Sequence, residues 1–176
     1  MTGPIPVLVI TGPVGVGKST VSQAVSDVLD EAGLPHGVVE LDCLRHCHPS
    51  PPGDRFQMAL GFRNLAAVAA NYRAAGAEGL VLVDIVEARA QRCDYRKAIP
   101  GAEVRLVGLL GSLATIESRL AGRESGANLE WHRRRAAELI EQWEASPVAD
   151  YLVDTEGRTP LEVAREVVAR CGWVRL

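Results

Sequence analysis

The fold of this chain is decided by the stretch Gly12-Pro13-Val14-Gly15-Val16-Gly17-Lys18-Ser19-Thr20. The stretch matches the phosphate-loop pattern G-x-x-x-x-G-K-[ST] at every defined position. The apolar residues 5–11 before it predict a buried strand, and the helical spacing of valines after Lys18 predicts a helix. A glycine loop between a strand and a helix is the context in which this pattern binds the phosphates of a nucleoside triphosphate. The alternative is a chance glycine-rich turn, which the full pattern in this context disfavours.

The parts of this loop have separate predicted roles. Its glycines let the backbone adopt positive φ and approach phosphate oxygens closely. We expect Lys18 to reach the β- and γ-phosphates and the hydroxyl of Ser19 to ligate Mg²⁺. Residues 12–20 together are therefore the predicted nucleotide site, with ATP and Mg²⁺ as its cofactors.

Length and composition favour one α/β domain. The chain has 176 residues, of which 47% are hydrophobic and only 5% aromatic, so valine, leucine and alanine build the core. A core of this kind is typical of a parallel sheet covered by helices, and we expect residues 1–176 to form a single domain. A formal net charge of −3 gives no reason to expect nucleic acid or an anionic membrane as a partner. No apolar run approaches the length needed to cross a bilayer, and we expect a cytoplasmic protein.

Strand and helix patterns alternate along the chain, which predicts a parallel sheet with helices on both faces. The predicted strands cover residues 5–11, 38–41, 80–84, 104–110 and 151–153. The predicted helices begin at Lys18 and near Arg55, after Ser112, near Leu129 and after Thr159. A polar, glycine-bearing interruption precedes the fourth helix, and residues 122–130 are predicted to form a small lid.

Carboxylates follow the predicted strands at the edge of the sheet where ligands bind in this fold class. Asp84 is predicted to hold Mg²⁺, directly or through water, as a strand-end carboxylate does in phosphate-loop enzymes. Asp42 is predicted to orient an acceptor hydroxyl and accept its proton. Glu87 is a weaker candidate for the metal or for a substrate contact. For Asp42 and Asp84 the alternative is an ordinary cap of the following turn.

Two groups of arginines are candidates for charge stabilisation. Arg119 and Arg123 lie at a helix end and in the predicted lid, where they could close over the phosphates. The alternative is a solvated face paired with nearby glutamates. Arg45, Arg55 and Arg63 flank the Pro-rich loop of residues 49–53 and are candidates for binding an anionic acceptor.

A cluster of sulfur and imidazole side chains leaves one question open. Cys43, His46, Cys47 and His48 lie close together in the sequence, which suggests zinc. Their spacing fits none of the usual pairs of zinc ligands, and no second pair follows. We expect reduced thiols here and assign the cluster no role.

As a whole, the order of these elements resembles the small P-loop kinases, a group that includes adenylate, shikimate, gluconate and adenylylsulfate kinases and chloramphenicol phosphotransferase. The resemblance is sharpest at Gly12–Thr20. It implies a three-layer P-loop NTPase fold with five parallel strands in the order 2-3-1-4-5.

Two further stretches carry this resemblance. Leu41-Asp42-Cys43-Leu44-Arg45-His46, followed by Asp54-Arg55 and Arg63-Asn64, is similar to an adenylylsulfate kinase run. The likeness implies that Asp42 is the acceptor-site carboxylate and that Arg45, Arg55 and Asn64 contact the substrate. The ending at 153–164 resembles gluconate kinases and chloramphenicol phosphotransferases, which implies that Thr155 and Arg158 lie near the adenine.

The sequence thus predicts an enzyme, a monomer or homodimer, that transfers the γ-phosphoryl of ATP to a hydroxyl of a small molecule or nucleotide. One alternative is a nucleotide-dependent switch, although the chain has no Asn-Lys-x-Asp run of the usual GTPases. Another is a nucleotide-binding module that has lost catalysis. The acceptor is not predicted.

Overall fold

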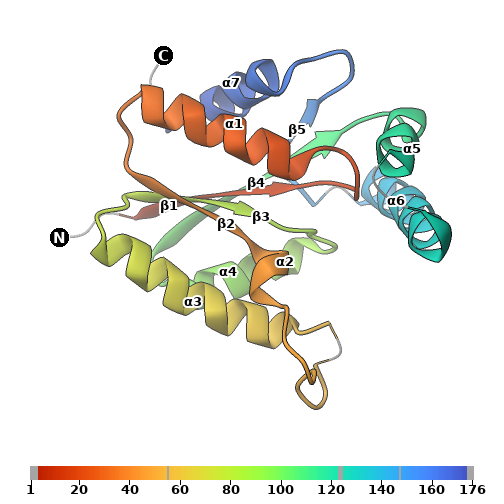
Figure 1. Ribbon diagram of the computed structural model, residues 1–176. Helices are drawn as coiled ribbons and strands as arrows, with labels where there is room; N and C mark the ends of the chain where they lie inside the picture. Colours follow the sequence, from red (N-terminus) through yellow and green to blue (C-terminus); the bar gives the residue numbers. More distant parts are fainter. Residues whose placement is uncertain (1–3, 55, 123–124, 147, 174–176) are drawn as a thin grey trace.

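The computed structural model describes residues 4–54, 56–122, 125–146 and 148–173. Its centre is a sheet of five parallel strands in the order β2-β3-β1-β4-β5, which confirms the predicted order (Figure 1). The strands are β1 Ile5–Thr11, β2 His36–Glu40, β3 Gly79–Val83, β4 Ala102–Leu110 and β5 Tyr151–Asp154. The central strand β1 pairs with β3 through Ile10 and Val83 and with β4 through Thr11 and Gly108. The carboxyl ends of these three strands therefore meet at one edge.

Helices cover both faces of the sheet, and a further pair lies at its carboxyl edge (Figure 1). One face carries α1 Lys18–Glu31 and α7 Pro160–Cys171, and the other carries α3 Met58–Ala74 and α4 Arg92–Ala98. At the carboxyl edge lie α5 Leu113–Ala121 and α6 Gly126–Ala145. The remaining helices are short: α2 Leu41–Leu44 and the 3-10 helix η1 Arg89–Gln91.

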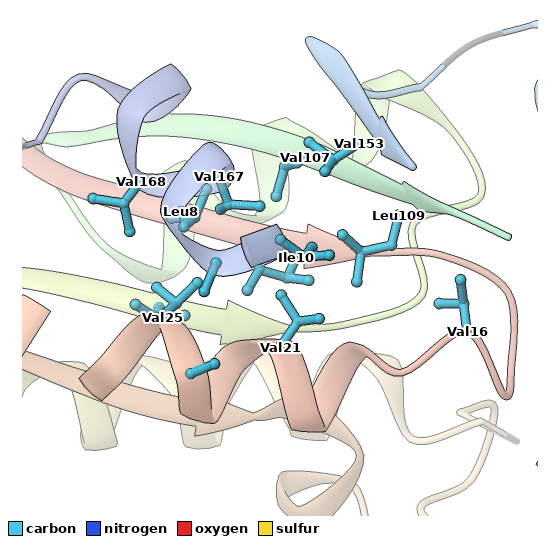
Figure 2. Packing of buried hydrophobic residues seen from close by; sticks show 14 of the residues in the cluster. Leu8, Ile10, Val16, Val21, Val25, Val107, Leu109, Val153, Val167 and Val168 are labelled. Carbon is cyan, nitrogen blue, oxygen red and sulfur yellow. The ribbon is translucent and has the colours of Figure 1, made fainter. Parts of the chain in front are cut away.

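Alternation along β1 divides the core into two clusters. Leu8 and Ile10 point toward α1 and α7, where they pack with Val21, Val25 and Val167 (Figure 2). Val7 and Val9 belong to the second cluster, with residues of α3 and α4. Successive side chains of a strand point to opposite faces, so β1, buried on both sides, holds the phosphate loop on a rigid base.

Two predicted helix starts are confirmed in detail. The side chain of Ser112 accepts a hydrogen bond from the backbone N–H of Thr115, at the start of α5. Thr159 and Glu162 form a reciprocal capping box at the start of α7, with Pro160 in the first turn. Such caps satisfy the backbone N–H groups that have no partner inside the helix.

Several boundaries differ from the predicted ones. β2 ends at Glu40, and Leu41 begins α2, so Asp42 lies in a helical turn and not on the strand. α3 begins at Met58 instead of residue 55, and α6 begins at Gly126 instead of residue 129. The sequence analysis did not predict α4, whose seven residues include several charged side chains that obscure its apolar face. Among the described helices, none is long and apolar enough to cross a membrane.

Candidate functional site

The loop of residues 12–17 has the backbone shape that its glycines predict. Gly15 and Gly17 adopt φ values of 88° and 106°, which side chains rarely tolerate. A Cβ at Gly12 would lie 2.8 Å from Cγ1 of Val16, so this position accepts only glycine without a shift. The loop leads directly into the amino end of α1, where the helix dipole and backbone N–H groups favour an anion.

The side chain of Lys18 folds back over this loop and binds its backbone. Its ammonium group donates hydrogen bonds to the carbonyl oxygens of Gly12, at 3.0 Å, and Pro13, at 3.1 Å. The lysine therefore lies across the loop that it is predicted to serve. Ser19 is exposed beside it.

Helix α5 brings an arginine to the same loop. Nη1 of Arg119 donates a hydrogen bond of 2.9 Å to the carbonyl oxygen of Val16. A Cβ at Gly15 would lie 2.9 Å from Cγ of Leu120, which shows how closely α5 contacts the loop. Arg123, the second arginine predicted for the lid, lies outside the described residues.

A cleft of about 940 Å³ extends from the phosphate loop to α2 and α6. Lys18, Ser19 and Thr20 form one wall, and Asp42, Arg45 and His46 face them from α2 and the residues after it. A second hollow, of about 880 Å³, lies at the opposite end of the sheet, near Pro35 and Trp173. Because open parallel sheets bind ligands at the carboxyl ends of their strands, the cleft beside the phosphate loop is the candidate site.

The chain after α2 is organised by Gln57. Its side-chain amide donates hydrogen bonds to the carbonyl oxygen of Cys47, at 2.9 Å, and to Oγ of Ser50, at 3.0 Å. Asn64 donates to the carbonyl oxygen of Leu44 at 2.7 Å, which ties α3 to the end of α2. These bonds shape the wall of the cleft that lies across from the phosphate loop, which Phe56, Gln57 and Met58 also line.

Below this wall, the side chain of Asp84 is completely buried, and both of its carboxylate oxygens accept hydrogen bonds. Its Oδ1 accepts hydrogen bonds from Nη2 of Arg45, at 2.7 Å, and from the backbone N–H of Ile85, at 2.8 Å. Its Oδ2 accepts one from the hydroxyl of Tyr95, at 2.5 Å. Arg45 also reaches Oδ1 of Asp42, at 3.3 Å. Four side chains from three segments thus form one connected network.

Burial sets the titration of the two innermost groups. Burial raises the pKa of Asp84, and the Arg45 charge and the hydrogen bonds from Tyr95, Arg45 and Ile85 offset part of that rise. Burial and the neighbouring carboxylate of Asp84 raise the pKa of Tyr95 well above 10.0, its ordinary value. Tyr95 therefore stays protonated and acts as the hydrogen-bond donor to Asp84.

The third side of the cleft comes from α6. Arg135 forms an ion pair with Glu87, whose carbonyl oxygen also accepts a hydrogen bond of 2.8 Å from Gln142. Trp131, about half exposed, lies one helical turn before Arg135 and lines the cleft with it. Glu87 is thus held beside the cleft by a helix, as a substrate contact would require.

Other predicted site residues lie elsewhere. Arg63 is exposed on α3 and is not among the residues that line the cleft. Thr155 is buried and donates a hydrogen bond of 2.8 Å to the carbonyl oxygen of Leu110, and Arg158 forms an ion pair of 2.7 Å with Glu166. Neither Thr155 nor Arg158 lines the cleft. Arg55 lies outside the described residues.

Several residues that line or support the cleft were not predicted from the sequence. Trp131 and Arg135 line the cleft and are not among the site residues predicted from the sequence. The detectable signal was their spacing, because residues four apart share one helix face. Tyr95 gave no such signal, since its role depends on a contact with Asp84 across the fold.

The cysteine and histidine cluster remains without a role. Cys43, His46, Cys47 and His48 are all exposed. Within the described residues, no group of three His, Cys, Asp or Glu side chains is arranged to hold a metal ion.

Comparison with known proteins shows which class of protein shares this fold. No model of a known protein family and no curated protein matches the chain. Among solved structures, the adenylylsulfate (APS) kinase of Mycobacterium tuberculosis, in complex with AMPPNP and APS, is 25% identical. Its TM-score is 0.61, and the match covers 95% of this chain and 97% of that chain.

Two other solved structures show the same arrangement. A gluconokinase from Sinorhizobium meliloti 1021 is 24% identical, with a TM-score of 0.62 and coverage of 96% of this chain and 93% of its own. The tunicamycin resistance protein of Deinococcus radiodurans is 20% identical, with a TM-score of 0.68 and coverage of 96% of both chains. The chain therefore has the fold of the small P-loop kinases, and these neighbours support a nucleotide-dependent phosphotransferase.

Proposed function

We propose that this chain is an ATP-dependent phosphotransferase that moves the γ-phosphoryl of ATP to a hydroxyl of a small-molecule or nucleotide acceptor. The observation that carries the proposal is the single cleft that joins the phosphate loop to Asp42 and Arg45. A nucleotide seated on Lys18 and an acceptor seated beside Asp42 would meet in that cleft. Phosphoryl transfer depends chiefly on such positioning and on stabilisation of charge.

On the donor side, the loop and two cations would act on the phosphates. The backbone N–H groups of residues 12–20 would bind the β- and γ-phosphates, and Lys18 would exchange its bonds to Gly12 and Pro13 for bonds to phosphate oxygens. Arg119 already contacts the loop through Val16. This contact supports the proposal that its guanidinium would stabilise the charge that develops on the transferring group.

On the acceptor side, Asp42 would take the proton of the acceptor hydroxyl. Its side chain is 71% exposed and carries one bond, to Arg45, so an oxygen remains accessible from the cleft. The acceptor oxygen would then form a bond to the γ-phosphorus while the bond to the bridging oxygen of ADP breaks. Arg45, Glu87 and Trp131 would contact the acceptor, and the predicted contacts of Arg55, Arg63 and Asn64 belong to the same proposal.

Ser19 fits Mg²⁺, because its exposed hydroxyl is an oxygen ligand at the start of α1, beside Lys18. Asp84 does not fit as a direct ligand, since its buried oxygens are already bonded to Arg45, Tyr95 and Ile85. When bound, the ion would neutralise charge on the phosphates. Thr155 and Arg158 remain proposed adenine contacts, supported by the family resemblance alone.

A screen for ADP production tests this function. The purified chain would be given ATP, Mg²⁺ and one candidate acceptor at a time: nucleosides and nucleotides, sugars, sulfonucleotides and hydroxylated antibiotics. Lys18→Ala serves as the blank. We expect ADP and a phosphorylated acceptor, identified by mass spectrometry, in equal amounts. ATP hydrolysis that yields no phosphorylated product with any class, and that only a protein partner stimulates, would instead identify a nucleotide-dependent switch.

A further inference from the structure

The surroundings of Asp84 determine what its carboxylate can do. The side chain has no exposed surface, and its two oxygens accept three hydrogen bonds, from Arg45, Ile85 and Tyr95. An Mg²⁺ ligand needs an oxygen that faces the ion and its waters. The carboxylate faces protein donors instead, beneath the cleft floor that Val83 and Ile85 help to form.

Arg45 is correspondingly held from several sides. Nη2 binds Asp84 at 2.7 Å, and the side chain is only 13% exposed. Its aliphatic part lies against α3, since a Cβ at Gly61 would be 2.7 Å from Cγ of Arg45. A guanidinium fixed by a buried carboxylate and a packed stem has little freedom to move.

The same guanidinium reaches the acceptor wall. Nη1 of Arg45 donates a hydrogen bond of 3.3 Å to Oδ1 of Asp42, which lines the cleft opposite Lys18. The order of contacts therefore runs from Tyr95 through Asp84 and Arg45 to Asp42. Each step is a hydrogen bond to or from a charged group, the kind that gives the most geometric control.

We propose that Asp84 is a positioning residue of the acceptor wall: held by Tyr95, it fixes Arg45 and thereby orients Asp42, and it does not ligate the metal. This proposal rests on the proposed function for the role of Asp42. The contacts of Asp84 with Arg45 and Tyr95 do not depend on that function.

Binding of ADP tests the metal half of the proposal without any acceptor. Calorimetry would compare ADP with and without Mg²⁺ on the wild type, Asp84→Asn, Tyr95→Phe and Ser19→Ala. Loss of a metal ligand is expected to weaken the gain from Mg²⁺ by about tenfold or more. We expect that loss for Ser19→Ala alone. An equal loss in Asp84→Asn would overturn the proposal.

Kinetics test the positioning half, with the acceptor that the screen identifies. Asp84→Asn and Arg45→Met should each lower kcat or raise KM for the acceptor and leave KM for ATP unchanged. Because Asp84 acts through Arg45, the double variant should be no worse than Arg45→Met alone. Effects that multiply in the double variant would show that Asp84 acts independently, and the proposal would be wrong.

Thermal melting supplies a result even if no acceptor is found. Asp84→Asn removes the buried carboxylate that pairs with Arg45 and leaves only the exposed Asp42 beside it, so Asp84→Asn/Arg45→Met should melt above Asp84→Asn. If Asp84→Asn does not fold, Tyr95→Phe, which retains the ion pair, carries the Mg²⁺ and kinetic tests. A wild type that binds MgADP but phosphorylates nothing would refute the proposed function, whereas the melting and Mg²⁺ results would still decide the role of Asp84.

Discussion

Nη1 of Arg119 donates a hydrogen bond of 2.9 Å to the carbonyl oxygen of Val16, so α5 is joined to the phosphate loop by an arginine. The contact is local in space but spans about a hundred residues of sequence. Gly15 makes it feasible, because any side chain there would collide with Leu120. The hydrogen bond to Val16 and the close packing of Leu120 on Gly15 thus hold the guanidinium of Arg119 at the loop.

Arg119→Gln should lower phosphoryl transfer by about 10²–10³-fold, the usual effect of removing one group that stabilises transition-state charge. The measurement is kcat with the identified acceptor. Arg134→Gln is the matched control, since Arg134 is an exposed arginine that pairs with Glu138 at 3.7 Å on α6. If both variants behave like the wild type, Arg119 is a structural tie and no more.

Asp42→Asn should lower kcat by about 100-fold, because the amide cannot accept the acceptor's proton. KM for ATP should stay unchanged, since Asp42 lies across the cleft from the phosphate loop. Steady-state kinetics with each substrate varied in turn would measure both constants. Cys43→Ser changes the exposed neighbouring residue of α2 and should have wild-type activity. Full turnover by Asp42→Asn would refute its role as base.

Gly61→Ala should have effects of opposite sign in two backgrounds. In the wild type the added methyl would lie 2.7 Å from Cγ of Arg45 and displace it, which lowers both stability and acceptor turnover. In Arg45→Ala the collision is absent, and alanine should raise the free energy of unfolding by about 1 kcal/mol through its helix propensity. Urea unfolding of the four proteins checks this. The same sign in both backgrounds would argue against packing between Gly61 and Arg45.

Asp150 should make the fold sensitive to acid. Burial tends to raise the pKa of this carboxyl, but hydrogen bonds from Arg92 and the N–H of Leu106, with the charge of Arg89, outweigh it and lower the pKa. The stabilisation is therefore complete above the ordinary value of 3.8 and is lost as pH falls through the lowered value.

Asp150→Asn should cost about 1 kcal/mol near pH 7, a modest figure because the carboxylate is partly exposed. The cost should shrink below about pH 4, where the wild-type carboxyl also becomes neutral. Denaturation at a series of pH values measures it. Asp94→Asn, which removes an exposed partner of Lys97, should be nearly neutral throughout. A loss for Asp150→Asn that does not vary with pH would mean that its charge is irrelevant.

The fold could be predicted because its signals are local. The loop pattern, the apolar strands and the caps at Ser112 and Thr159 each depend on residues near one another in sequence, and the structure confirms them. The strand order came only from the family resemblance, since alternation of strands and helices does not determine which strands are neighbours.

The candidate site was less predictable because its contacts are distant in sequence. The local sequence around a strand-end aspartate does not distinguish one that binds a metal from one that pairs with an arginine. Only the fold places Arg45 and Tyr95 beside Asp84. The boundary at Glu40 was misjudged for a similar reason. Three of the four residues 38–41 are apolar and predict a strand, yet pairing with β3 ends at Glu40, and Leu41 begins α2 with its side chain buried.

Within the described residues, strand β2 is an edge strand that pairs only with β3. Residues 42, 45, 46 and 56–58, which follow it in the sequence, line the side of the cleft where we propose that the acceptor binds. The opposite side, where we propose that the nucleotide binds, comes from the phosphate loop and the start of α1, which follow the central strand. These two sides of the cleft therefore belong to separate, contiguous stretches of sequence, one after the central strand and one after the edge strand, and α6 adds the third side. Under the proposed function, the residues after β2 can be exchanged to change the acceptor, while the residues that would bind ATP stay unchanged.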